Sequence, residues 1–154
     1  MKAIKLIIIA LNLFVGGLMI SGGLEKFKGE TPSPNKMIEQ VKAGEEIAPN
    51  DHVLVLKNYV FGMKQTGYFW PFLGIMELLA GALLISQVFS KIGAIIAFPI
   101  TVNIFLFHAF LEPDELGELA MMTVMLIANA YLILRTKKTW KPLLYDKESL
   151  ALKG

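Results

Sequence analysis

The 154-residue chain contains no cysteine, which excludes disulfides, thiolate nucleophiles, cysteine-ligated iron–sulfur clusters and CxxC redox motifs within it. Any redox role would therefore use a bound cofactor or a partner protein. Charged residues are also scarce, at 18%, and the formal net charge is only +2, with the basic residues scattered along the chain. This charge balance does not indicate a nucleic-acid partner.

Histidine is rare as well, because His52 and His108 are the only two and they lie in different regions of the chain. No HxxxH motif is present, and we do not expect a carboxylate–histidine pair at the spacing of metal ligands. The sequence therefore predicts no metal site. No Walker, Rossmann or Ser-His-Asp pattern is evident either, so no catalytic residue is assigned.

Apolar residues, by contrast, make up 55% of the chain, and the mean hydropathy is +0.56. Four stretches approach the ~20 residues that a helix needs to cross ~30 Å of hydrocarbon. They are Leu6–Leu24, Phe69–Val88, Ile92–Phe110 and Leu116–Leu134. The first continues too far and lacks the small-x-small site of a cleaved signal peptide, so we interpret it as an anchor. The sequence predicts an all-α integral membrane four-helix bundle, with residues 1–154 forming one domain.

The outer loop between the first two spans, residues 25–68, is long enough to hold structure of its own. Ser33-Pro34 and Gly44 are typical of a helix start and stop, which predicts a short helix over Pro34–Ala43. A second helix should begin near Asn50 or Asp51 and lie on the outer membrane surface or cap the bundle. Its apolar stripe would consist of Val53, Leu56, Val60 and Met63.

The distribution of lysine and arginine predicts the orientation in the membrane. These residues are more numerous on the side that holds both termini and the tail 135–154, whereas the short loop Glu112–Glu115 is purely acidic apart from its proline. Both termini are therefore predicted to be cytoplasmic. Trp70 and Trp140 suit the aromatic belts at the two membrane interfaces.

Glu77 is an acid in the middle of the second span. It lies eight residues from the start of that span, which places it about 12 Å below the outer interface. A short carboxylate cannot reach water from that depth, and burying it costs ~2.5–3.5 kcal/mol on the insertion scale. Glu77 should therefore face the bundle interior, and an ionisable residue there is a candidate for function.

Other polar residues inside the spans suggest partners for this acid. In the functional interpretation, Glu77, Asn103 and His108 frame a polar pocket, with Asn12 and Thr101 as further candidates. By helical spacing, Thr101 and His108 share a face and Asn103 points away from it. The alternative is a hydrogen-bond network between helices, also involving Asn129, that only stabilises the bundle.

Small residues indicate which helices pack closely, because they let helix backbones approach in lipid. One face of the first span and one face of the second are expected to meet each other or the bundle axis. These faces carry Asn12, Gly16 and Gly23, and Gly74, Glu77 and Gly81. At the end of the first span, Glu25 and Lys26 are interpreted as interfacial charges, with Lys26 reaching toward lipid head groups. A salt bridge from Glu25 to the pocket is the alternative.

Three segments together resemble the DoxX family of small four-span bacterial membrane proteins. They are Gly23-Leu24-Glu25-Lys26-Phe27, the stretch from Gly67-Tyr68 to Glu77-Leu78-Leu79-Ala80-Gly81, and Pro99-Ile100-Thr101-Val102-Asn103-Ile104-Phe105-Leu106-Phe107-His108. The resemblance covers roughly Ile4 to Leu134. It implies a bacterial cytoplasmic membrane location and Glu77, Asn103 and His108 as family-like polar positions. It also implies a link to membrane oxidoreductase complexes, since the family is named after subunits similar to those of a thiosulfate:quinone oxidoreductase.

Three functions stay open at this point. The favoured one is an accessory or binding subunit of a larger membrane complex, because no catalytic constellation is present. The alternatives are a quinone-handling oxidoreductase subunit that uses Glu77 and His108, and a small transporter or lipid-handling protein. Quinone and lipid are the candidate ligands. The expected partners are the bilayer and other membrane subunits or a second copy, with no nucleic acid.

Overall fold

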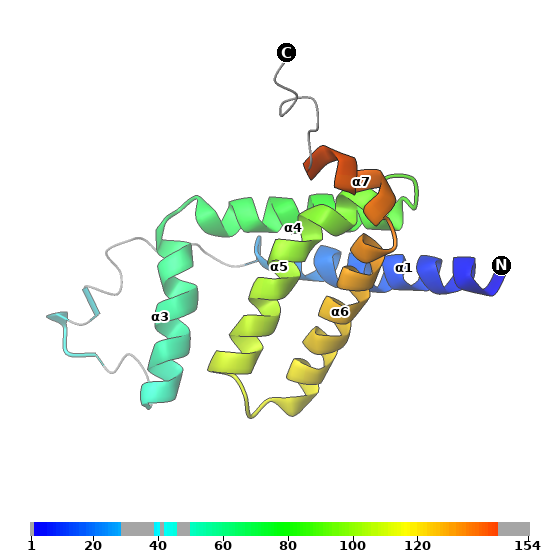
Figure 1. The fold of residues 1–154 in the computed structure, drawn as a ribbon. Coiled ribbons are helices and arrows are strands. Elements are labelled where there is room, and N and C mark those ends of the chain that lie inside the picture. The colour runs from blue at the N-terminus through cyan, green and yellow to red at the C-terminus, as the bar shows by residue number, and fades with distance from the viewer. Residues whose placement is uncertain (1, 29–38, 41, 46–49, 145–154) are drawn as a thin grey trace, which may run out of the picture.

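The structure is a computed structural model that describes residues 2–28, 39–40, 42–45 and 50–144. Every long regular element within these residues is a helix, which confirms the all-α prediction. The helices are α1 (Lys2–Glu25), α3 (Asp51–Gln65), α4 (Phe69–Ile85), α5 (Ser90–Leu111), α6 (Leu116–Leu134) and α7 (Lys137–Leu144) (Figure 1).

Three of these helices, α1, α5 and α6, are long and apolar enough to cross a membrane. α4 has 17 residues and reaches a spanning length only together with α3, from which it is bent by 87°. Large apolar side chains such as Leu6, Phe72 and Ile127 are exposed on the outside of the helices, as lipid contact requires. The chain is therefore a multi-pass membrane protein with three spans, or four if α3 and α4 form one broken span.

The predicted second span, Phe69–Val88, ends three residues early. Gln87 adopts a φ of 59°, which no helix interior accommodates, and its side-chain oxygen accepts a hydrogen bond of 2.9 Å from Asn12 Nδ2. The bend at the other end of α4 coincides with Gly67, whose φ is 73°. Glycine takes this conformation without the steric cost that a side chain adds.

The second helix predicted for the outer loop is present as α3. Asn50 is its N-cap, and its side-chain oxygen accepts a 2.9 Å hydrogen bond from the amide of Val53. The predicted apolar stripe is half-buried along its whole length. The helix expected over Pro34–Ala43 lies mostly outside the described residues. Gly44, its predicted stop, has a φ of 71°, as is common where helices end.

α1 and α4 lie side by side and form the most extensive helix contact, through the two glycine faces that the sequence indicated (Figure 1). A Cβ added at Gly81 would lie 2.8 Å from the Gly16 carbonyl oxygen, and one at Gly23 would lie 3.0 Å from the Gly74 carbonyl oxygen. These distances leave no room for a side chain. Of the two alternatives that the sequence left open, contact with each other or with the bundle axis, the two faces make the first.

The core joins this helix pair to α5 and α6. It is built mainly from small and flexible apolar side chains, including Ala80, Ala94, Ala97 and Met125. α5 and α6 run side by side away from α1 and α4, and α3 lies beside α5 (Figure 1). We call the region where α3 packs against α4 and α5 the long-loop end, because α3 belongs to the long loop between α1 and α4.

Candidate functional site

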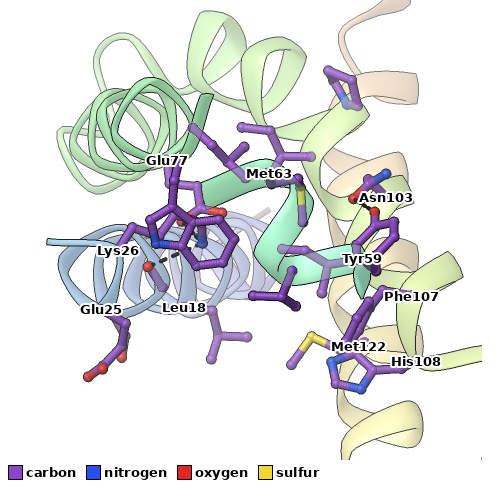
Figure 2. Close-up of a pocket in the computed structure, with 18 of the residues that line it drawn as sticks. Leu18, Glu25, Lys26, Tyr59, Met63, Glu77, Asn103, Phe107, His108 and Met122 are labelled. Carbon is purple, nitrogen blue, oxygen red and sulfur yellow. Dashed lines mark hydrogen bonds and ion pairs between the residues drawn. The ribbon is translucent and has the colours of Figure 1, made fainter. Parts of the chain in front are cut away.

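A cavity with a volume of about 630 Å³ lies at the long-loop end. All five helices from α1 to α6 contribute to its wall, which is mainly apolar. Figure 2 shows charged groups on one side, with Asn103, Phe107 and His108 on the other and Leu18 and Met63 between them. The cavity is large enough for a small amphipathic molecule.

Glu77 forms an ion pair with Lys26 in the wall of this cavity. Lys26 Nζ donates to Glu77 Oε2 at 2.7 Å, and the side chains are 13% and 1% exposed. Oε1 of Glu77 has no hydrogen-bond partner among the described residues, so the lysine provides its main compensation for burial. Gly22 leaves space for the carboxylate, since a Cβ there would lie 3.3 Å from Oε2.

The interpretation of Lys26 as a head-group contact is therefore wrong. Its ammonium points inward, because it pairs with the buried carboxylate of Glu77. The ammonium also lies 5.2 Å from the ring centroid of Trp70, and Lys64 Nζ lies 4.9 Å from the same ring. Both distances fit cation–π interactions.

Among the described residues, Glu25 forms no ion pair with Lys26, the lysine that pairs with Glu77. It lines the cavity but pairs with Lys28, and both side chains of that pair are well exposed. Such a surface pair contributes little to stability. The description of Glu25 as an interfacial charge fits this arrangement better than the salt bridge into the pocket.

The opposite wall belongs to α5 and α3. Tyr59 of α3 donates a hydrogen bond of 3.1 Å from its hydroxyl to Asn103 Oδ1, and its ring packs 5.4 Å from that of Phe107. The rings of His108 and Phe107 form a T-shaped pair with their centroids 5.2 Å apart. The amide nitrogen of Asn103 and the ring of His108 are thus polar groups on this side of the cavity.

Asn103 and His108 line the same cavity although they lie on different faces of α5. Five residues of helix separate them by about 140° around the axis, so they mark the two edges of a broad stripe that faces the cavity. Thr101 shares a face of α5 with His108, as predicted. It lies just outside the stripe that faces the cavity, on the side of α5 that packs against α6. There it lies 3.2 Å from the side-chain amide of Asn129.

Two of the candidate pocket residues, Thr101 and Asn12, are therefore not part of this cavity. Thr101 and Asn129 are fully buried in the core, where they link α5 to α6. Asn12 lies in α1 near the opposite end of the bundle, beside a second cavity of about 180 Å³ that Gln87, Lys91 and Arg135 also line. For Asn12 and Asn129, the structure therefore supports the alternative interpretation, in which they form hydrogen bonds that stabilise the bundle.

His108 also has two acidic neighbours that the sequence analysis did not combine with it. Its Nδ1 lies 3.0 Å from Glu112 Oε2, one helical turn later, and 3.6 Å from Glu118 Oε2 at the start of α6. The expectation that no carboxylate–histidine pair lies at ligand spacing is therefore wrong. His108 and Glu112 are four residues apart, which brings side chains together on a helix.

Tyr59, Met63 and Trp70 are cavity residues that the sequence analysis did not assign to a site. Met63 was placed on the apolar stripe of the predicted helix, and Tyr59 lies on the same helical face three residues after Leu56. That pattern indicates a packed face but not what it packs against. Trp70 was assigned only to the membrane interface, because its position at the start of the second span suggests nothing more.

A family model, that of DoxX, matches residues 7–109, which is more than half of the 154-residue chain. The match runs from α1 to the end of α5 and therefore includes Lys26, Glu77, Asn103 and His108. No curated protein and no solved structure matches the chain significantly.

Proposed function

The chain belongs to the DoxX family, and from the cavity at its long-loop end we propose that it is a quinone-binding subunit of a larger membrane complex. The observation that carries the proposal is an apolar cavity of about 630 Å³ with polar groups on two opposing sides. A quinone has the same pattern, because its flat apolar ring carries an oxygen at either end.

The residues present fit the two oxygens of such a ring. Quinone carbonyls accept hydrogen bonds, and the cavity offers the Lys26 ammonium on one side and the Asn103 amide or His108 on the other. Tyr59 occupies the Asn103 oxygen and thereby leaves the amide nitrogen as the donor. The aromatic rings of Trp70 and Phe107 provide flat surfaces for the ring to pack against.

A subunit fits this chain better than a complete enzyme. A bound quinone supplies the capacity to carry two electrons and two protons, but the chain has no cysteine to deliver electrons. The polar groups of the cavity can bind the ring and exclude water from it. The electrons would come from a partner protein, which is why we infer a complex.

The quinone test measures what copurifies with the protein. We expect an organic extract of gently purified protein to contain quinone in near-stoichiometric amount. Met63→Trp fills the cavity from α3 and should lose the quinone. Val55→Trp makes the same kind of change on the exposed face of that helix and should keep it. Equal quinone in both variants, or none in the wild type, would refute the proposal, and lipid in its place would make the cavity a lipid site.

The partner is tested separately by native mass spectrometry of the protein extracted from its own membrane. A stoichiometric redox protein that stays bound would support the subunit role. A chain recovered only as a monomer or a homo-oligomer would contradict it, whatever the cavity contains.

We further propose that the protein resides in a bacterial cytoplasmic membrane with both termini in the cytoplasm. The excess of lysine and arginine on the terminal side supports this orientation. A green fluorescent protein fused to the C-terminus should fluoresce, whereas an alkaline phosphatase fused there should be inactive. The reverse pattern would invert the orientation and place the large cavity near the cytoplasmic surface.

A further inference from the structure

A histidine and two glutamates converge where α5 ends and α6 begins. Nδ1 of His108, one carboxylate oxygen of Glu112 and one of Glu118 all lie within 4.8 Å of one another. His108 lies in the last turn of α5 and Glu112 is the C-cap residue of that helix, whereas Glu118 comes from the first turn of α6. The short turn between the two helices brings the third group to the other two.

The distances within this cluster suit a single metal ion. An ion bound tetrahedrally at ~2.1 Å from each ligand separates the ligand atoms by about 3.4 Å. Nδ1 lies 3.0 Å from the Glu112 oxygen and 3.6 Å from the Glu118 oxygen, on either side of that value. Three ligands would leave a coordination position for water or another molecule.

His108 Nδ1 provides a second, independent indication. The residue is 91% buried, and Nδ1 has no hydrogen-bond partner among the described residues, although the Glu112 oxygen lies 3.0 Å away. The ring nitrogen and the carboxylate are thus close without the alignment of a hydrogen bond. A buried ring nitrogen that lies beside two carboxylates without a hydrogen bond to either is available to bind a metal ion held between the three groups.

The charge around the cluster also favours a cation. Glu112, Asp114, Glu115 and Glu118 lie within seven residues, and no lysine or arginine occurs between Lys91 and Arg135. In the described structure, neither glutamate of the cluster pairs with lysine or arginine. A divalent ion would compensate this negative charge.

We propose that His108, Glu112 and Glu118 bind a divalent transition-metal ion of the zinc type. The imidazole disfavours Mg²⁺ and Ca²⁺, which prefer oxygen ligands, and the small number of protein ligands is typical of zinc. Glu112 and Glu118 lie beyond residues 7–109, so the site is not part of what the family match describes. The proposal goes beyond the quinone-binding role and does not depend on it.

Metal binding would have one consequence for the neighbouring cavity. An ion on Nδ1 leaves Nε2 as the nitrogen that carries the proton, so the His108 ring can only donate a hydrogen bond. Because this ring lines the large cavity, the ion would determine which kind of atom the cavity binds there.

The test uses Zn²⁺ and Co²⁺ with the full chain in detergent, purified through a tag without histidine and stripped with a chelator. His52→Ala serves as the background, so that His108 is the only histidine. We expect one Zn²⁺ per chain by elemental analysis and visible absorption bands on addition of Co²⁺. His108→Ala should abolish both signals.

Glu118→Gln is the decisive variant, because its side chain is 59% exposed and its loss should not prevent folding. We expect calorimetry to show zinc affinity at least about tenfold weaker. Glu115→Gln removes the same charge from an exposed position nearby, outside the cluster, and should leave the affinity unchanged. The proposal is overturned if the background protein binds no zinc, or if the Glu115 and Glu118 variants weaken binding equally.

Discussion

Exchange of Lys26 for methionine removes the cation that compensates Glu77 while keeping a flexible apolar stem. At 2.7 Å, the attraction between the two charges is about 6 kcal/mol with the effective dielectric constant of ~20 that reproduces measurements on proteins. Most of this attraction offsets the free-energy cost of removing the two charged groups from water. Loss of the lysine leaves a carboxylate that is 1% exposed without compensation, which costs about 3–5 kcal/mol of unfolding free energy.

Glu77→Gln should be milder, at about 1–3 kcal/mol. The lysine follows the last residue of α1 and is 13% exposed, so its long side chain can turn to the interface when the carboxylate is gone. Glu77 has no such route to water. The double variant Lys26→Met/Glu77→Leu should lie close to the wild type, because no buried charge then needs a partner.

These free energies can be measured by denaturation in mixed micelles, with helix content followed by circular dichroism. Lys28→Met is the matched control, since Lys28 pairs with Glu25 where both side chains are exposed and should contribute less than about 1 kcal/mol. The reasoning is refuted if Lys26→Met destabilises no more than Lys28→Met. It is also refuted if the double variant is destabilised as much as Lys26→Met alone.

Two further predictions concern the contact between α4 and α5 and the start of α3. Gly93→Ala should destabilise the protein by about 1–3 kcal/mol, because its Cβ would lie 2.8 Å from the backbone nitrogen of Leu84 and 2.9 Å from the Ala80 carbonyl oxygen. Gly17→Ala has open space and should be neutral or slightly stabilising in the same denaturation assay; equal losses in both variants would contradict the packing argument. Asn50→Ala should cost about 1 kcal/mol locally by removing the N-cap of α3, seen as faster hydrogen exchange of the amides near Val53. Unchanged exchange there would show that the cap is unimportant for α3.

The elements of the fold could be predicted well because each depends on local patterns. Long apolar runs place α1, α5 and α6, and Asn50 identifies the start of α3. The contact between α1 and α4 was also predictable, because lipid offers no hydrophobic drive and small residues then indicate where helices meet. The end of α4 could not be predicted, since Gln87 follows it in a backbone conformation that few residues other than glycine adopt.

The site was predictable only in part. The sequence alone determined that Glu77 lies too deep to stay without a partner, because helical rise and membrane thickness suffice for that argument. The identity of the partner depended on the tertiary structure. Lys26 is 51 residues away in the sequence, and it reaches Glu77 only because α1 and α4 pack closely at the glycines beside it.

The same distinction applies to His108. Its four-residue spacing from Glu112 was present in the sequence, whereas Glu118 joins them only through the turn between α5 and α6. Likewise, Asn103 and His108 line one cavity because α3 and α4 surround a wide face of α5. Periodicity determines which face of a helix a residue occupies, but only the packing of the helices decides which neighbours that face meets.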